Sequence, residues 1–316
     1  MKLRKACDIY SLTTEHLRHA GPASKIIILR LLKNIIGSVN YLTCPQIKKG
    51  LSAMTYKGKK KPITESSSHR RITVTPQLGG IIDMYIDNMA EYIFREVQSS
   101  DQLGFTSNIS YLLGALERGE CQRYAIDIDG QAAFPSVDRD IQVRELFACG
   151  ETGDLLKYSH NTYQNTVSQE KQDGMLGREF REYKGSCQGH KQAAGHFKSY
   201  INPCLTVTNS SQLGFWIGPI CVTCVCVSDD TYVLSGDPRK LQNIINIVGH
   251  YGRRYRVTFG ADKTKVTITC SKQDMSYYQD INIWSLDGNK LAVTEDNDHL
   301  GLMTILALLS LASRRR

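Results

Sequence analysis

The chain has 316 residues, of which 41% are hydrophobic, enough for a sizeable core in one large domain or two modest ones. Lysine and arginine outnumber aspartate and glutamate by 39 to 31, and the net charge of +8 fits either a phosphate-backbone partner or an ordinary solvated surface. Charged residues interrupt the first ten positions and no apolar run is long enough for a bilayer, so we expect no membrane partner. We expect an intracellular protein, nuclear or cytoplasmic and not secreted, whose ten cysteines are reduced thiols.

The N-terminal part is predicted to be mostly helical. Residues 1–50 place apolar side chains at partly helical spacing, and the Gly-Pro-Ala-Ser segment at 21–24 predicts the end of one helix and the start of another. Apolar side chains also recur at helical spacing over 77–98, and a further helix is predicted over 108–118.

A basic hairpin is predicted between these helices. The lysine-rich segment 57–68 precedes the β-prone stretch 71–75, and we predict a flexible basic hairpin over 57–76. For any single lysine of this segment, an exposed loop without a ligand is the alternative.

The stretch from Tyr124 to Asp129 predicts a short strand that ends in acidic residues. Strand alternation places Asp127 and Asp129 on the same face, so alternation alone does not choose between them. A helical insertion is predicted to follow over 140–184, with a turn at Asp173-Gly174.

Two adjacent carboxylates follow a second predicted strand. The apolar run 220–227 and the strand-like residues 231–234 flank Asp229 and Asp230, which predicts a β-hairpin with the aspartates at its turn. Adjacent negative charges repel each other, and a hard divalent cation relieves that repulsion by taking carboxylate oxygens as ligands. With Asp129 on a neighbouring strand, three carboxylates would suffice for a two-metal site of phosphoryl transfer. A solvated turn is the alternative for the pair alone.

Cys221, Cys224 and Cys226 lie in the same apolar run. A zinc site is one interpretation, but no fourth ligand is near in sequence, and small buried strand residues are the favoured interpretation.

The last predicted elements are an amphipathic helix over 241–251 and a strand over 266–269. Strands crossed by helices, with antiparallel pairing at the hairpin, predict an α+β fold in which helices back an antiparallel sheet. The tail 304–316 matches no expected element.

Several motifs resemble those of reverse transcriptases. Asp129, Ala133, Phe134 and Val137 match the family's aspartate-x-x-x-Ala-Phe-x-x-Val motif, and residues 227–230 resemble its x-Ala-Asp-Asp box with serine in place of alanine. Further segments along the chain match other motifs of the family, in the order in which the family has them: His69 to Pro76, Gln102 to Phe105, Gly185 to Gly189, Asp262 to Lys265 and His299 to Gly301. Together they resemble the reverse transcriptase domain of a LINE-type (non-LTR) retrotransposon.

The resemblance implies a right-hand polymerase fold. Its expected parts are a fingers-like helical region over 1–120 with the basic fingertip hairpin, a palm over 121–303 with the helical insertion, and an atypical tail. No thumb is expected within the chain.

The resemblance also implies chemistry. Asp129, Asp229 and Asp230 would be the catalytic metal ligands for two Mg²⁺, or Mn²⁺, with Asp230 the weaker ligand, and the reaction would transfer a nucleotide from a dNTP to a primer 3′-hydroxyl. The implied partners are an RNA template, a DNA primer, dNTPs and the other domains of a retroelement polyprotein.

Six more residues are implied in substrate binding. Arg70 and Arg71 would hold the nucleotide triphosphate, Gln188 and Gly189 would lie beside the template and incoming base, Lys263 would meet the leaving pyrophosphate, and Phe134 would exclude a ribose 2′-hydroxyl.

Pro135 and His190 depart from the LINE pattern, which usually has an acidic residue and a serine there. This leaves open a catalytically silent, truncated retroelement remnant that at most binds nucleic acid. A nucleotidyl cyclase, a third candidate, is disfavoured by the motifs at Arg70 and Gly104.

Overall fold

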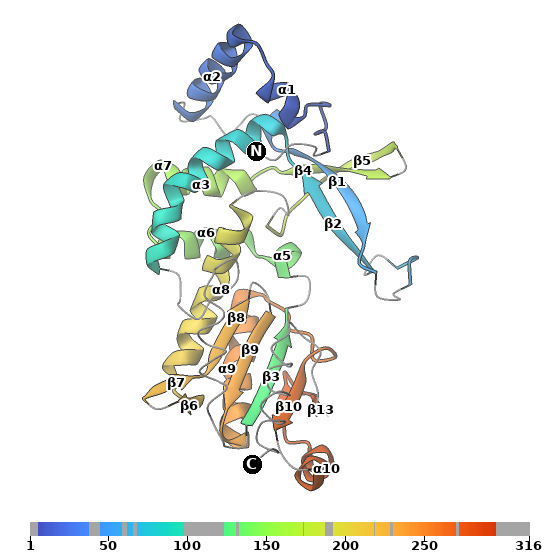
Figure 1. Cartoon of the computed structure of the whole chain (residues 1–316), viewed down its shortest axis with the longest axis vertical. Helices are drawn as coiled ribbons and strands as arrows, with labels where there is room; N and C mark the ends of the chain where they lie inside the picture. Colours follow the sequence, from blue (N-terminus) through green and yellow to red (C-terminus); the bar gives the residue numbers. More distant parts are fainter. Residues whose placement is uncertain are drawn as a thin grey trace, which may run out of the picture. The chain divides into compact units, whose positions relative to one another are not determined.

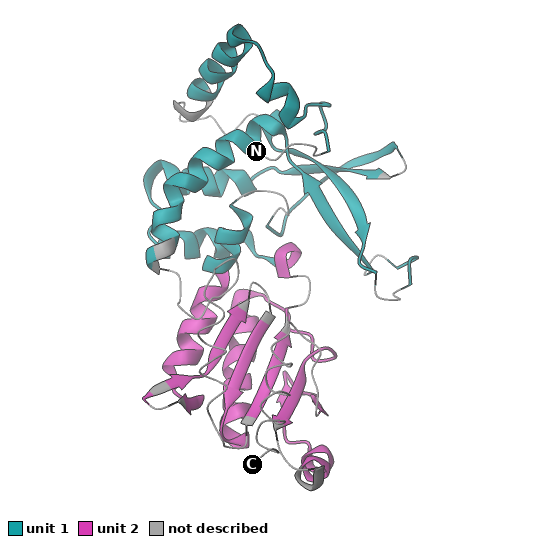
Figure 2. Cartoon of the chain, in the orientation of Figure 1, with its two compact units in different colours: residues 1–97, 137–199 teal, residues 98–136, 200–316 magenta. Residues whose placement is uncertain are grey.

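The computed structural model describes residues 6–37, 45–58, 62–65, 68–97, 123–130, 133–172, 174–186, 192–217, 219–227, 230–269 and 272–294. The chain forms two compact units, each built from two stretches of sequence (Figure 2). Unit 1 comprises residues 1–97 and 137–199, and unit 2 comprises residues 98–136 and 200–316. The division predicted from sequence, at residue 120, stays a prediction; the units differ from it in grouping 137–199 with the N-terminal residues.

Helices of unit 1 pack through a small apolar core. Buried Leu32 of α2 meets Ile82 and Ile86 of α3 and Tyr158 of α7. Helix α2 begins at Pro22, where the sequence predicts a break, because proline suits the first helical turn. The predicted helix over 108–118 lies outside the described residues. The helical elements are α1 (Thr14–Arg18), α2 (Pro22–Gly37), η2 (Pro45–Ile47), α3 (Gln77–Val97), α6 (Arg139–Ala148) and α7 (Gly153–Tyr163).

A four-stranded sheet completes unit 1, with the order β2-β1-β4-β5 (Figure 1). Strands β1 and β2 pair antiparallel, which confirms a hairpin, although its first strand begins at Lys49, earlier than predicted. The strands are β1 (Lys49–Tyr56), β2 (His69–Val74), β4 (Val167–Gln172) and β5 (Met175–Arg181).

The predicted insertion over 140–184 is helical only as far as Tyr163. From Val167 the chain forms the hairpin β4–β5, with Gly174 at positive φ in its turn. The prediction of helix fails here because β4 pairs in parallel with β1, a non-local contact that buries Ser168 and that local residue spacing does not reveal.

Unit 2 is built on a five-stranded sheet of order β13-β10-β3-β9-β8 (Figure 1). All neighbouring pairs are antiparallel except the edge pair β10–β13, which is parallel. The predicted strands and the hairpin are therefore present. Their bounds are β3 (Arg123–Asp129), β8 (Cys224–Val227), β9 (Asp230–Ser235), β10 (Lys265–Thr269) and β13 (Ala292–Thr294).

Helix α9 (Pro238–Tyr255) packs against β3 and β9. Its apolar stripe is fully buried, which confirms the predicted amphipathic helix. Asp237 caps it by accepting bonds from the amides of Arg239 and Lys240. The remaining elements are α5 (Ala133–Ser136), α8 (Ala193–Ser210), α10 (Lys272–Ile281), β6 (Phe215–Ile217), β7 (Ile220–Val222), β11 (Ser285–Leu286) and β12 (Asn289–Lys290).

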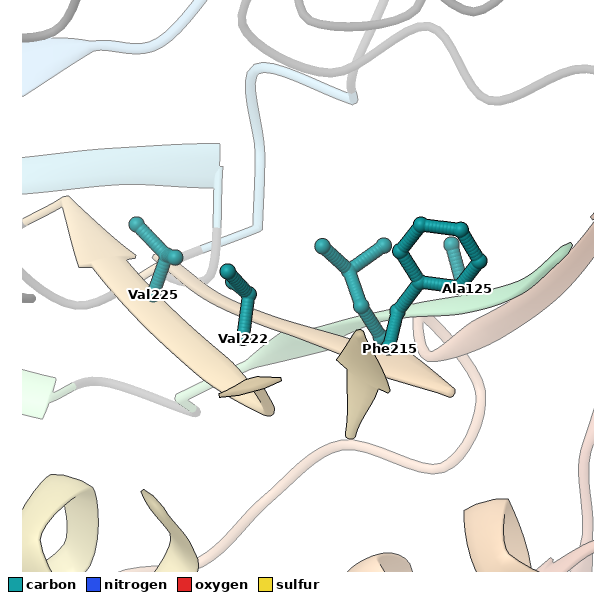
Figure 3. Packing of buried hydrophobic residues seen from close by; sticks show 5 residues of the cluster. Ala125, Phe215, Val222 and Val225 are labelled. Carbon is teal, nitrogen blue, oxygen red and sulfur yellow. The ribbon is translucent and has the colours of Figure 1, made fainter. Parts of the chain in front are cut away.

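A second apolar cluster lies beside the sheet of unit 2. Phe215 of β6 and Val222 of β7 gather with Ala125, Val225 and Leu234 of the sheet (Figure 3). The predicted apolar run 220–227 is thus two strands in two different sheets, β7 and β8.

None of the helices within the described ranges has the length and apolar character to traverse a bilayer.

Candidate active site

The register of unit 2 brings two of the three predicted catalytic positions together. Asp129, the last residue of β3, is the Cα partner of Asp230, the first residue of β9. Directly opposed residues of antiparallel strands have Cα atoms about 4.5–5.5 Å apart. Asp230 is in turn the partner of Val227 at the end of β8, so three strand ends meet at one point of the sheet. Asp229 lies outside the described residues, as do the side chains of Asp129 and Asp230.

Asp127 occupies a different environment. Its Cα partners are Tyr232 of β9 and Lys265 of β10, and the residue is only 3% exposed. Strand alternation did not distinguish these two positions of β3, but their surroundings differ: Asp129 opposes a carboxylate residue across the strands, and Asp127 does not.

The donor chemistry at this point of the sheet fits a hard divalent cation. Aspartates placed on opposing strands repel each other, and Mg²⁺ is held in proteins by one or two carboxylates together with substrate phosphates. Among the side chains that the structure describes, which exclude those of Asp129, Asp229 and Asp230, there is no group of three histidine, cysteine or acidic residues suited to a metal.

Phe134 lies on α5, the short helix that follows β3 in unit 2, and is half-buried. The preceding Ala133 is buried, and its carbonyl accepts a bond from Ser136 Oγ at 3.0 Å. This helix begins four residues after Asp129, so it keeps Phe134 close to the strand end along the chain.

Arg70 and Arg71 differ in their surroundings. Their Cα partners on β1 are Thr55 and Met54, so the two arginines alternate across the strand pair. Arg70 is exposed, whereas Arg71 Nη2 lies 3.1 Å from Glu182 Oε1 and its guanidinium lies 5.3 Å from the Phe180 ring centre.

The remaining predicted residues are Lys263, Gln188 and Gly189. Lys263 is exposed in the turn before β10, where its amide donates to Gly260 O at 3.2 Å. Gln188 and Gly189 lie outside the described residues. Before them, Gly185 adopts a φ of 90°, and its amide donates to Val137 O at 2.8 Å.

Sequence reasoning missed Arg139, which is buried near the start of α6. Its guanidinium donates to the carbonyls of Gly185 at 3.1 Å and Tyr163 at 2.6 Å and to Thr166 Oγ1 at 2.8 Å. The available signal was a charged residue two positions after the motif residue Val137, directly before the predicted helical insertion.

Buried polar groups also surround Glu151 in unit 1. Burial raises the pKa of its carboxyl from 4.5 to about 7, against the bond it accepts from Ser159 Oγ at 2.7 Å. His196 Nε2 lies 3.9 Å from Glu151 Oε1, and its Nδ1 lies 2.6 Å from Tyr163 Oη. Tyr163 Oη lies 3.0 Å from Ser186 Oγ, which extends the polar cluster to the Gly185 segment.

The cysteines of the apolar run are strand residues. Cys224 and Cys226 are fully buried in β8, as the favoured interpretation predicted, and Cys221 is half-buried in β7.

Comparison with known proteins now assigns the class. The family model described as reverse transcriptase (RNA-dependent DNA polymerase) matches residues 58–293, well over half of the chain. The chain therefore belongs to the reverse transcriptase family. No curated protein matches it.

The chain also aligns with solved structures. Apo telomerase from Candida tropicalis, truncated from its C-terminal domain, aligns with a TM-score of 0.52 at 11% identity, over 78% of this chain and 56% of that one. Telomerase from Candida albicans, bound to the TWJ fragment of telomeric RNA, aligns with a TM-score of 0.48 at 10% identity, over 79% and 46%. The chain thus spans about half the length of these structures, and its mixed α+β architecture is that of a right-hand polymerase.

Proposed function

We propose that this chain is the polymerase part of a LINE-type reverse transcriptase that transfers nucleotides from dNTPs to a primer 3′-hydroxyl on an RNA template. The observation that carries the proposal is the pairing of Asp129 with Asp230 at the end of β3 and β9, within two motifs that resemble the family's. The LINE assignment rests on the further motifs that match in order from His69 to Gly301, and it implies a retroelement polyprotein with further domains. The protein would act inside the cell, in the nucleus or the cytoplasm.

The carboxylates of Asp129 and Asp229 would hold two Mg²⁺, or Mn²⁺, with Asp230 as a weaker ligand. Bound there, the metal pair would supply Lewis acidity for the attacking hydroxyl and the leaving pyrophosphate. The protein's own part is to fix Asp129 and Asp230 at the ends of the paired strands β3 and β9. Rigid elements hold ligand positions better than loops do.

Other residues would bind and select the substrates. Unit 1 would act as the fingers and unit 2 as the palm. Arg70 and Arg71 would bind the triphosphate, since guanidinium groups form paired bonds to phosphate. Lys263 would donate to the pyrophosphate, and Gln188 and Gly189 would lie beside the template and the incoming base. Phe134 would exclude the 2′-hydroxyl of a ribonucleotide.

The test is primer extension on an RNA template with Mg²⁺, combined with duplex binding measured on the same proteins. Asp229→Asn should abolish extension and spare binding, because it removes a ligand charge at nearly constant size. Asp280→Asn, at an exposed position of α10 in unit 2, is the matched control and should extend normally. Normal extension by Asp229→Asn would refute the assigned role.

Asp127→Asn separates the two candidate ligands on β3. If Asp129 is the ligand, Asp129→Asn abolishes extension, while Asp127→Asn retains measurable extension in protein that remains folded. The reverse result would transfer the metal-binding role to Asp127.

A second candidate function is nucleic-acid binding without catalysis. Pro135, within α5, stands where LINE enzymes usually carry an acidic residue, and this departure favours a silent remnant. Duplex binding by the wild-type chain without any extension would support this candidate against the polymerase.

A further inference from the structure

Glu182 is a buried carboxylate shared by two arginines of unit 1. Its side chain is 6% exposed; Oε1 lies 3.1 Å from Arg71 Nη2, and Oε2 lies 3.7 Å from Arg139 Nη2. Ser168 Oγ donates to Oε1 at 2.8 Å. Strand β2, strand β4 and helix α6 are therefore joined through one carboxylate.

Arg139 is the fixed end of this arrangement. It is 7% exposed and contacts the Glu182 carboxylate. It also donates to the carbonyl of Tyr163, which precedes β4, and to the carbonyls of Glu182 and Gly185, which follow β5. Each of these donors satisfies a backbone carbonyl in the interior, where an unsatisfied polar group is costly. Arg139 consequently cannot move without breaking several bonds, and Glu182 is held from that side.

Arg71 is the accessible end. Its side chain is 35% exposed, so solvent and ligands can reach it, yet the Glu182 carboxylate and the Phe180 ring restrain its guanidinium. An arginine carries five N–H donors, and one carboxylate oxygen does not exhaust them. Two guanidinium groups around one carboxylate leave a net charge of +1, so the group still attracts an anion.

We propose that Glu182 and Phe180 are positioning residues that hold Arg71 ready to bind the triphosphate of the incoming nucleotide. The inference rests on the proposed function, in which Arg71 meets the nucleotide. Ordering a long side chain costs free energy on binding, and a side chain already restrained avoids much of that cost. Glu182 therefore acts on nucleotide affinity through Arg71, without touching the nucleotide itself.

The sign of the effect distinguishes positioning from simple electrostatics. Glu182→Gln removes a negative charge, so a carboxylate that acted only by its field would, once neutralised, lower the KM for an anionic nucleotide. A positioning carboxylate gives the opposite result, because Arg71 becomes free to adopt other rotamers. Glu179→Gln is the matched control, since Glu179 lies three residues before Glu182, on β5, in an exposed ion pair with Lys49.

The experiment measures KM and kcat for dNTP in primer extension, duplex Kd, and thermal unfolding for each variant. Glu182→Gln and Phe180→Leu should raise KM about three- to tenfold, the cost of ordering one long side chain, with kcat and duplex Kd nearly unchanged. Glu179→Gln should leave KM within about twofold, as expected for an exposed pair. Glu182→Asp, which restores the charge, should recover part of the loss.

A double-mutant cycle links the effect to Arg71. Arg71→Gln should raise KM at least about tenfold, the value of a charged hydrogen bond, and adding Glu182→Gln to it should change KM by less than about twofold. Should Glu182→Gln fail to fold, Phe180→Leu and its cycle with Arg71→Gln carry the same test.

The outcomes separate the two proposals. A wild-type chain that extends no primer refutes the polymerase. A wild-type chain that extends primers, with Glu182→Gln and Phe180→Leu no different from Glu179→Gln, overturns the positioning role alone. Raised duplex Kd at unchanged KM would likewise overturn it, because Arg71 would then serve the nucleic-acid backbone.

Discussion

Replacing Glu151 by glutamine should remove a pH-dependent loss of stability. The Glu151 side chain is fully buried at the loop between α6 and α7, where it accepts a bond from Ser159. The titratable groups that face it are His196, at 3.9 Å, and Cys149, whose own thiol pKa is raised by burial. Glutamine has nearly the same shape and keeps an acceptor for Ser159, but it cannot ionise.

The sign and the size of this change in stability follow from the pKa of the Glu151 carboxyl. Burial raises the carboxyl pKa from 4.5 to about 7, so between these values the folded state binds more protons than the unfolded state. Stability is then greatest below pH 4.5 and falls as the pH rises towards 7 and above. At about 1.4 kcal/mol per pKa unit, the full loss above pH 7 is on the order of 3 kcal/mol.

The assay is denaturant unfolding of wild type and Glu151→Gln at pH 5, 6, 7 and 8. The free energy of unfolding of the wild type should fall by about 2–3 kcal/mol relative to the variant between pH 5 and pH 8. Glu170→Gln, at an exposed position of β4, serves as the control for removing one acidic group. A difference that stays level or reverses with pH would refute the reasoning, and would indicate that protonated His196 holds the carboxylate ionised.

Two further predictions concern ligands. Duplex affinity should fall steeply with salt, and Lys57→Gln, in the basic hairpin, should reduce the log–log slope by about 0.9, the release of one counterion. A flat salt response would show that the net charge is not used on phosphates. Phe134→Ala should raise ribonucleotide over deoxynucleotide incorporation in a primer-extension competition, because it opens space beside the sugar. Phe147→Ala, at an exposed phenylalanine of α6, is the control, and an unchanged ratio in active Phe134→Ala would exclude the gating role.

Local patterns predicted much of unit 2. The strands ending at Asp129 and Val227 and the helix α9 carry their signals in consecutive residues, as alternation or as a 3.6-residue stripe. Short chain connections then pair β8 with β9, so the hairpin needed no long-range information.

Unit 1 was less predictable because its key contacts are distant in sequence. Strand β4 pairs with β1 across more than a hundred residues, and the residues of β4 are mostly polar. Arg139 and Glu182 likewise have partners far from them along the chain, and a charged residue in a sequence is by default expected at the surface. Their burial follows only once the sheet exists to supply the carbonyls that Arg139 bonds.

The register that opposes Asp129 and Asp230 is itself enforced by the hydrophobic pattern of β3. Ile126 and Ile128 are fully buried on the face of Tyr124, which contacts Trp284 and Tyr278. Because side chains alternate with a period of two, a slip by one residue would move both isoleucines out of this apolar face and would turn the carboxylate of Asp127 into it. The aspartate positions are interleaved with these isoleucines, so the core that fixes the isoleucines also fixes Asp129 at the strand end. The catalytic geometry we propose therefore depends on apolar residues that never meet the substrate.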